Sequence, residues 1–267
     1  MPQWRNWQTR SVQVAVHASE CRFKSCLRHI NPLMFQASAI FFPSNFPQLL
    51  SFLVKIFRKE IIMCSHIQQP PIQEIESYLK DELQLPLVKP TFSTEAFDTF
   101  TEVYPKRQAL VLLYQNDQLQ LQVKNWGYPS PFKQNQVLNN ARIERFYEAK
   151  PSMWDSSFAR QRCIVITSQF FESSRSTYTL ANGKKYHEEF SFKASDYPMT
   201  LLAGIYDSNY FALATTSSNQ TVLAAHPRMP LVISPAELRR WLFQNFTSLI
   251  DRTNFPITRT LLPHRQT

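Results

Sequence analysis

The sequence predicts an α+β fold for residues 63–267, with a mostly antiparallel, barrel-like β-sheet and peripheral helices. Three hairpin signals carry this prediction, because each places turn-forming residues between two apolar, strand-like runs. Helical spacing occurs only in a few short stretches, so we expect the sheet to dominate. The three turns are Asn116-Asp117, Asn182-Gly183 and Asp207-Ser208-Asn209.

Three stretches have the pattern of helices. Residues 72–83 show helical spacing of apolar side chains, and residues 141–150 form a second candidate helix that Pro151 stops. Asn140, directly before it, would be an ordinary N-cap. The last helix, 234–243, opens with Ser-Pro-Ala-Glu, which supplies an N-cap, a proline at N1 and the glutamate of a capping box. The predicted strands cover 109–114, 119–123, 163–167, 178–180, 186–192, 201–206, 210–215 and 231–233.

Residues 1–62 differ in character from the rest of the chain. They hold eight Lys/Arg and two Asp/Glu, a balance of +6 out of the +9 of the whole chain. The stretches 4–10 and 21–26 resemble translations of a leucine transfer-RNA gene. We therefore expect 1–62 to be a spurious or disordered extension and 63–267 to be the catalytic domain. The apolar run 49–57 is far shorter than the ~20 residues of a membrane span, so we expect no membrane anchor.

Composition excludes several classes of function. The 21 basic and 18 acidic residues from Met63 onward give little support to a polyanionic partner on bulk charge alone. Only three glycines occur, which argues against a glycine-rich, phosphate-binding loop. The cysteines Cys21, Cys26, Cys64 and Cys163 have unrelated spacings, typical of neither a zinc site nor a disulfide framework. We expect reduced thiols, no metal and a cytoplasmic location.

Met63-Cys64 is the most informative dipeptide, because Met63 has the position of a true initiator. Its removal would leave Cys64 as the N-terminal residue, with an α-amine of pKa about 7.7–8.0 beside a thiol of pKa about 8.5. An amine and a thiol on adjacent carbons condense with an aldehyde, first to an imine and then to a thiazolidine ring. The alternative is that Cys64 is simply a small buried residue.

Other positions carry groups that chemistry could use. Glu172 follows Phe170 and Phe171 at the end of an apolar strand, where burial would raise its pKa. His226 precedes Pro-Arg-Met-Pro, and Asn140 precedes Ala-Arg. Each also has an ordinary structural interpretation: a solvent-facing glutamate, a core histidine and a helix cap. The same ambiguity holds for Trp126, Arg142 and Arg228.

In this order the residues resemble the SOS-response-associated peptidase (SRAP) family, also called abasic site processing proteins. The resemblance covers residues 63–234 and begins with a cysteine directly after the initiator, where that family has its catalytic cysteine. The chain departs from the family pattern at Ser65-His66, where Gly-Arg is usual, and at Ser173 and Tyr206, where Trp is usual. The segments that carry the resemblance are Met63-Cys64, Trp126-Gly127, Asn140-Ala141-Arg142 with Glu144, Arg162-Cys163, Phe171-Glu172, Ala203-Gly204, 215–219 and 226–230.

The resemblance implies an SRAP fold and a protein that senses abasic sites in single-stranded DNA. It implies that Cys64 traps the ring-opened sugar as a covalent thiazolidine, with associated lyase activity and an autoprocessing cysteine peptidase activity. Glu172 would be the acid/base, and His226 would shuttle protons in opening the sugar ring. Asn140 would position the N-terminal residue or the sugar by hydrogen bonding.

The resemblance also implies a DNA interface and few other partners. Trp126 would stack on a base or wedge beside the lesion, and Arg142 and Arg228 would contact phosphates. It implies no metal or organic cofactor, no membrane and no obligate protein partner. We expect a monomer in the bacterial cytoplasm, associated with the nucleoid when it acts in the SOS response to DNA damage.

Two other functions remain as alternatives. A cysteine peptidase acting on other proteins would use Cys64 with His226 and Asn140, and would need no free α-amine. A non-catalytic module for single-stranded DNA would bind reversibly and with strong salt dependence, and Cys64→Ser would leave its binding unchanged.

Overall fold

The first hairpin has the turn that its residues predict. In the computed structural model, which describes residues 64 and 66–265, this hairpin joins β4 (Gln108–Gln115) and β5 (Gln118–Trp126). Its turn residues Asn116 and Asp117 have φ values of 52° and 60°. A two-residue turn that matches the twist of its strands needs such left-handed values, which Asn and Asp tolerate. The turn therefore sets a register that runs unbroken along all of β4.

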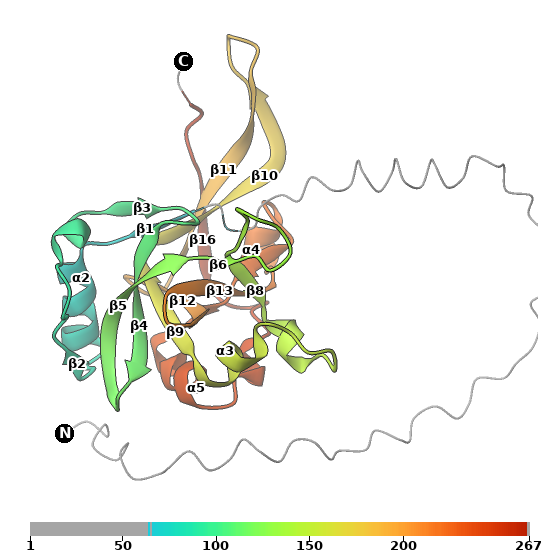
Figure 1. Cartoon of the computed structure of the whole chain (residues 1–267). Coiled ribbons are helices and arrows are strands. Elements are labelled where there is room, and N and C mark those ends of the chain that lie inside the picture. The colour runs from blue at the N-terminus through green and yellow to red at the C-terminus, as the bar shows by residue number, and fades with distance from the viewer. Residues whose placement is uncertain (1–63, 65, 266–267) are drawn as a thin grey trace, which may run out of the picture. The chain divides into compact units, whose positions relative to one another are not determined.

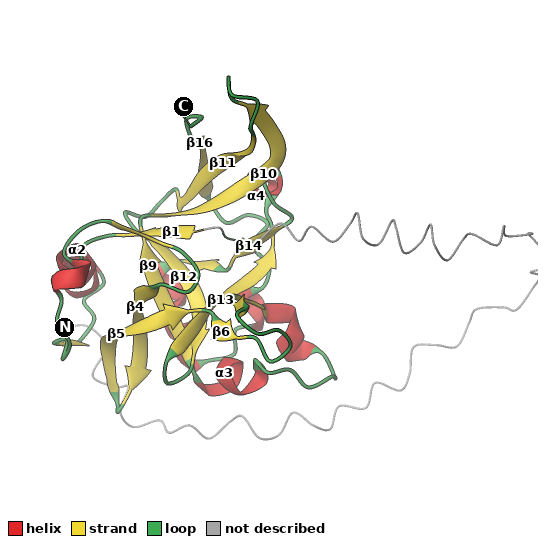
Figure 2. Ribbon diagram, turned by 45° about the horizontal axis from the view of Figure 1, so that its top comes forward, coloured by secondary structure: helices red, strands yellow, loops and turns green. Residues whose placement is uncertain are grey.

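Five strands close into a barrel within a nine-stranded sheet. The path runs from β13 (Tyr210–Ser217) through β12 (Thr200–Tyr206), β9 (Arg162–Thr167) and β4 to β5, and β5 pairs back with β13. Figures 1 and 2 show these strands wrapped around one core with short helices outside. This confirms the predicted fold class. The strands attached to this barrel are β2 (Leu87–Val88), β8 (Asn140–Arg142), β14 (Arg228–Pro230) and β15 (Val232–Ile233).

A second sheet of five strands carries the other half of the predicted site. Its order is β16-β11-β10-β1-β3, and every pair in it is antiparallel. The hairpin of β10 and β11 contains the predicted turn at Asn182-Gly183 and extends well beyond its neighbours (Figure 1). The bounds are β1 (His66–Gln69), β3 (Thr101–Val103), β10 (Gln169–Thr179), β11 (Lys185–Ala194) and β16 (Ile257–Leu261).

The helices are short and peripheral. The helix predicted over 72–83 is α2 (Ile72–Ser77), which continues as a π-helical turn, η2 (Tyr78–Glu82). The last predicted helix is a 3₁₀ turn, η5 (Pro235–Glu237), followed by α5 (Leu238–Phe243), and its capping box is present. No helix in the described part of the chain is long and apolar enough to span a membrane. The remaining elements are η3 (Glu95–Phe97), β6 (Tyr128–Pro129), β7 (Val137–Leu138), η4 (Ile143–Tyr147), α3 (Asp155–Arg160), α4 (Gln220–Leu223) and η6 (Thr247–Leu249).

The helix predicted over 141–150 is wrong. The chain there forms β8, which pairs in parallel with β13, and then only the 3₁₀ turn η4. Leu213 N also donates to Asn139 O at 3.0 Å, so backbone groups that a helix would use internally bond to the barrel instead. Asn140 is consequently a strand residue and caps no helix.

One buried cluster extends across both sheets and includes Cys64. Its members come from β1 and β10 on one side and from the barrel strands on the other. The described residues, 64 and 66–265, belong to one compact unit, and the extension predicted for 1–62 lies outside them. Among the large side chains of the cluster are Ile67, Trp126, Phe170, Phe192 and Phe211.

Gln69 joins the second sheet to the barrel. Its buried side-chain Nε2 donates to Leu110 O at 2.9 Å and to Ile166 O at 3.2 Å, and Leu110 N donates to its Oε1 at 2.8 Å. These bonds tie β1 to β4 and β9. They fix the strand that begins two residues after Cys64.

We expect Gln69→Leu to lower the free energy of unfolding by about 1–3 kcal/mol, because it leaves buried backbone groups of Leu110 and Ile166 without that partner. Urea denaturation measures this loss. Gln118→Leu, at an exposed position of β5, is the matched control and should stay within about 0.5 kcal/mol of wild type. An equal effect of the two substitutions would contradict the role of Gln69.

Candidate functional site

Cys64 and Glu172 are in direct contact although 108 residues separate them in the sequence. Cys64 N donates to both carboxylate oxygens of Glu172, at 2.9 Å to Oε1 and 3.0 Å to Oε2. Both residues have an exposed fraction of 0%. The nitrogen that would become an α-amine therefore already faces a buried carboxyl group.

The sequence analysis expected Glu172 at the end of a strand, but it lies within β10. β10 continues for seven residues beyond it, to Thr179, because the polar residues that follow are still paired with β11. Glu172 pairs with Phe190 of β11, and its neighbour Phe171 pairs with His66 of β1. The expected burial is present, but its cause is a central position in the five-stranded sheet.

Burial controls the ionisation of both reactive groups. It raises the pKa of Glu172 well above the ordinary value, although the hydrogen bond from Cys64 N opposes the shift. Burial also raises the pKa of the Cys64 thiol, and the nearby negative charge of Glu172 raises it further. The thiol Sγ lies 3.9 Å from His66 O. The two groups thus share one water-excluded site, in which burial makes both of them hold a proton more tightly than they would in water.

An aromatic stack borders this pair. The ring of His66 lies 3.9 Å from that of Phe171 and 4.7 Å from that of Tyr104, with interplanar angles of 8° and 18°. Its Nδ1 is 3.6 Å from Glu189 Oε1. Burial lowers the pKa of His66, while the negative charges of Glu189 and Glu102 oppose that shift. The sequence analysis missed this stack, because only the pairing of β1 with β10 brings the rings together.

The other predicted residues gather around β13 of the barrel. Asn140 pairs with Leu213 and Arg142 with Thr215 in the parallel β8–β13 ladder. Arg142 is exposed. Leu213 belongs to the same buried cluster as Cys64.

Arg228 is engaged with Glu144 in a bidentate ion pair. Its Nη1 donates to Oε1 at 2.6 Å and its Nη2 to Oε2 at 2.9 Å, and Nη2 also donates to Thr215 O at 2.7 Å. Burial alone would raise the pKa of Glu144, but the bonds from Arg228 and the charge of Arg142 outweigh it, so the pKa is lowered. Arg228 is thus paired with the Glu144 carboxylate, on which the charge of Arg142 acts more weakly. The sequence analysis noted Glu144 only as part of a motif.

His226 lies in the loop before β14 and is almost fully buried. Its Nδ1 accepts from Arg228 N at 3.1 Å and lies 3.0 Å from Arg228 O. The neutral ring can accept at Nδ1 and the charged ring can donate there, so either protonation state finds a backbone partner. Ala225 and Met229, on either side of it, belong to the same buried cluster as Cys64.

Trp126 is fully buried. Its ring stacks on Phe211 at a centroid distance of 6.0 Å, and its Nε1 donates to Asn139 O at 3.0 Å. An indole held in this way presents no open face to a base. Its stacking role stays a prediction that this burial does not favour.

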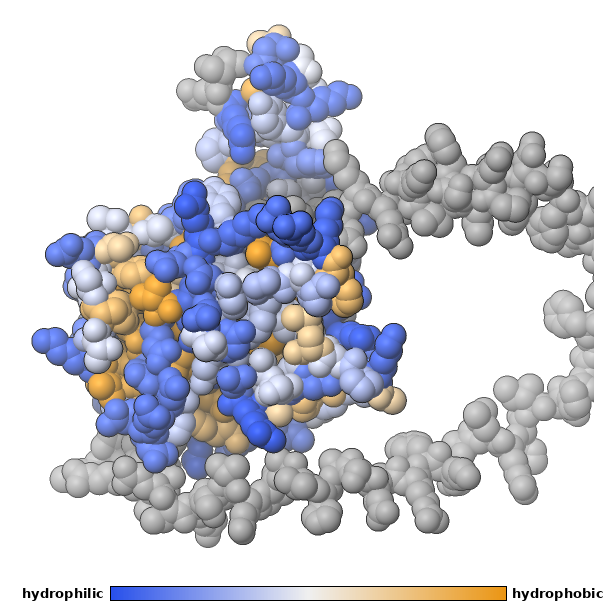
Figure 3. All heavy atoms as spheres, viewed as in Figure 1, coloured by the Kyte–Doolittle hydropathy of each residue, from blue (hydrophilic) through white to orange (hydrophobic). Residues whose placement is uncertain are grey.

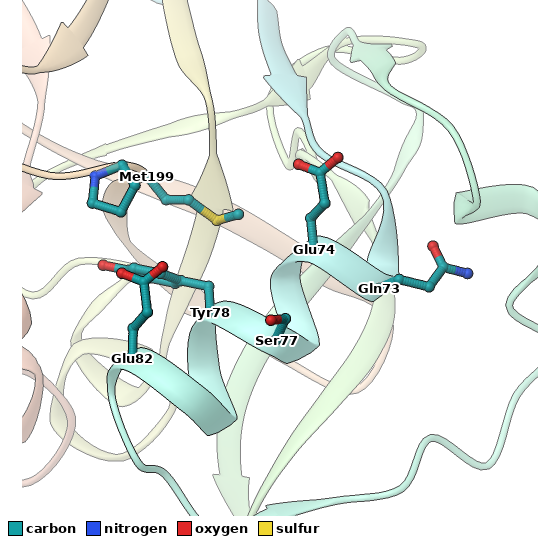
Figure 4. Close-up of a pocket in the computed structure, with 7 residues that line it drawn as sticks. Gln73, Glu74, Ser77, Tyr78, Glu82 and Met199 are labelled. Atoms are coloured by element: carbon teal, nitrogen blue, oxygen red, sulfur yellow. The ribbon is translucent and has the colours of Figure 1, made fainter.

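A separate open pocket of about 390 Å³ lies between the α2–η2 segment and Met199 (Figure 4). Glu74 and Glu82 contribute carboxylates to it, which disfavour a polyanion. Burial raises the pKa of Tyr78, also in the lining, to about 12. The pocket contains none of the predicted site residues. Within the described ranges, no cluster of three or more His, Cys, Asp or Glu residues could hold a metal ion.

Solved structures share the fold. A protein from Bordetella bronchiseptica matches with a TM-score of 0.54 at 15% identity, covering 75% of this chain and 100% of that one. A protein from Bacteroides thetaiotaomicron matches with a TM-score of 0.54 at 20% identity, covering 75% and 92%. A phage-related protein from Bordetella bronchiseptica gives 0.53 at 18%, covering 75% and 95%. At these identities the likeness concerns the fold alone.

Sequence comparisons identify the family. The chain is 26% identical over 153 residues to the abasic site processing protein YedK of Escherichia coli (strain K12). That match covers 54% of this chain and 65% of YedK. A family profile described as SOS response associated peptidase (SRAP) matches residues 63–257, which span both sheets and every residue of the candidate site. The chain therefore belongs to the SRAP family.

Proposed function

We propose that this chain processes abasic sites in single-stranded DNA by trapping their aldehyde as a thiazolidine at an N-terminal Cys64. The contact of Cys64 N with both oxygens of Glu172 carries the proposal, because it joins the attacking nitrogen to a buried acid/base. The family and the name of its relative YedK support the substrate class.

The proposed chemistry uses both nucleophiles of Cys64. The α-amine attacks the aldehyde carbon of the ring-opened sugar, and water leaves to give an imine. The sulfur then attacks the same carbon, and the thiol proton passes to the imine nitrogen, so that one water is lost overall. Glu172, with its raised pKa, takes a proton from the α-ammonium group and returns it to the departing hydroxyl group.

This chemistry needs a free α-amine at Cys64. In the continuous chain that nitrogen is an amide, whose lone pair is delocalised into the carbonyl group. Cys64 also has a φ of 50°, a left-handed conformation that costs an L-residue about 1–2 kcal/mol. Removal of Met63 abolishes that restriction and frees the amine. We therefore propose 63–267 as the working domain, exposed by initiator removal or by the chain's own peptidase activity.

The surrounding residues have supporting roles in the proposal. His226 moves protons as the sugar ring opens, and Asn140 positions the sugar or the N-terminal residue. Arg142, exposed beside β13, contacts phosphate. Arg228 can do so only if a phosphate replaces the Glu144 carboxylate. The imine also acidifies the adjacent sugar C–H bond, so slow β-elimination accounts for the proposed lyase activity. We propose that the protein acts as a nucleoid-associated monomer.

Cys64→Ser in a protein expressed from Met63 should abolish the crosslink, because a hydroxyl group does not close a stable ring. The assay is a denaturing gel of protein incubated with a single-stranded oligonucleotide that carries one abasic site. Cys163→Ala changes the other described cysteine and should keep the shifted band. A band that survives Cys64→Ser would refute the assignment. Reversible binding without any band would favour the non-catalytic module.

The chain expressed from Met1 should not crosslink unless it is cleaved before Cys64. We expect its intact mass to be unchanged by abasic DNA, whereas protein from Met63 should lack the methionine and gain the mass of the DNA strand. Mass spectrometry of the two proteins separates these cases. Crosslinking by uncleaved chain would show that a free α-amine is not required.

Glu172→Gln should slow crosslinking by about 10²–10⁴-fold, the usual contribution of an acid/base group. It should also change the pH dependence of stability in the full chain. The folded-state pKa of Glu172 lies above its unfolded value, so its stabilisation is complete below about pH 4.3 and is lost as pH rises through the folded pKa. We therefore expect the free energy of unfolding of Glu172→Gln, relative to that of wild type, to increase as pH rises.

Urea denaturation at a series of pH values tests the stability prediction. Glu95→Gln, which changes an exposed glutamate, is the matched control and should follow the wild-type profile. Two results would contradict the role given to the buried Glu172 carboxyl group. One is a wild-type crosslinking rate in Glu172→Gln, and the other is an unfolding free energy that depends on pH in the same way in Glu172→Gln and wild type.

A further inference from the structure

The outer part of the β10–β11 hairpin, residues 173–187, forms an arm that projects beyond Glu172 (Figure 1). It contains Arg175, Lys184 and Lys185, all exposed, and no Asp or Glu. The nearest acidic residues on this hairpin are Glu172, Glu188 and Glu189, at the root of the arm. The arm is mostly hydrophilic on the face seen in Figure 3.

The C-terminal segment 257–265 begins beside the root of the arm, and its last residues contact the arm and add to its charge. β16 pairs with β11, and beyond it Arg265 N donates to the hydroxyl oxygen of Tyr178 at 3.0 Å. This segment contributes exposed Arg259 and Arg265, and it also contains no Asp or Glu. Arg265 lies against the arm, whereas Arg259 pairs with Phe192 at its root, so four cationic side chains from two separate parts of the sequence belong to the projecting structure.

Aromatic rings lie among these cations. Tyr178 and Tyr186 face each other across the hairpin, with centroids 6.0 Å apart, and His264 stacks on Tyr178 at 3.8 Å and 4°. The guanidinium group of Arg265 lies 5.1 Å from the ring centroid of Tyr186. Cations that follow a backbone, together with rings on which bases can stack, are the features with which proteins bind single strands.

The arm starts at the reactive pair. The register between β10 and β11 shifts between Ser173 and Thr177, directly after Glu172, and such a bulge bends and twists a strand. Tyr178 is six residues beyond Glu172, a distance of about 20 Å along an extended strand. The arm is therefore long enough to reach nucleotides beyond the one at a trapped site.

We propose that the arm, with the C-terminal segment 257–265, binds the single-stranded DNA that flanks the abasic site. This inference rests on the proposed function, since it extends the path of the same strand. The arm sets how long a strand the protein holds, while Cys64 and Glu172 carry out the chemistry. The charge pattern favours a polyanion as the occupant.

The test compares oligonucleotides of two lengths, each with a tetrahydrofuran analogue of the abasic site, which has no aldehyde and so reports reversible binding. The protein starts at Met63 and carries Arg175→Ser, Lys184→Ser and Lys185→Ser together. For a 25-nucleotide strand we expect at least ~10-fold weaker binding by fluorescence anisotropy, and a salt-dependence slope smaller by about two. For a 5-nucleotide strand we expect no change.

The matched control removes three exposed lysines from outside the arm: Lys80→Ser, Lys89→Ser and Lys150→Ser. It should bind both strands as wild type does. Any of three results would overturn the proposal. The arm and control variants could lose affinity equally, the arm variant could lose affinity equally for both strand lengths, or it could lose none for the long strand. At saturating concentration the arm variant should still crosslink a true abasic site fully. If wild-type protein never crosslinks, the proposed function is refuted. The length-dependent loss of reversible binding would still test whether the arm binds single-stranded DNA.

Discussion

The contact between the Cys64 nitrogen and the buried Glu172 carboxyl group is the interaction on which the site depends. A charged carboxylate with an exposed fraction of 0% is costly unless it is paired, and the raised pKa of Glu172 expresses that cost. The amide N–H of the continuous chain is a weak partner for it. An α-ammonium group at the same place would be a full ionic partner and a proton donor. The fold thus provides an environment that suits an N-terminal Cys64 better than an internal one.

The two sheets carry different residues of the candidate site. The five-stranded sheet holds the reactive pair, with His66 stacked between Phe171 and Tyr104 beside it. The barrel holds the cations, with Arg142 exposed and Arg228 bound to Glu144. Gln69 ties the two sheets together by hydrogen bonds to two barrel strands. Because one buried cluster and these hydrogen bonds connect the two sheets, the nucleophile and the groups that would bind phosphate are held in one framework.

Local chemistry explains which parts of the structure could be predicted from the sequence. The turn at Asn116-Asp117 and the capping box at Ser234 depend on neighbouring residues, and both occur as expected. The strand at Asn140 was predicted as a helix cap, because its pairing with β13 involves residues more than seventy positions away. The contact of Cys64 with Glu172 spans 108 residues, so only the resemblance to a family suggested it in advance.

Peptide mapping of the DNA adduct tests the central claim most directly. Protein expressed from Met63 is reacted with an abasic oligonucleotide, treated with a thiol-alkylating reagent, and digested with nuclease and protease. We predict that the peptide beginning at Cys64 carries the sugar with the loss of one water, and that its sulfur resists alkylation. A sugar attached to a lysine, or a modified Cys64 whose thiol is still alkylated, would contradict thiazolidine formation.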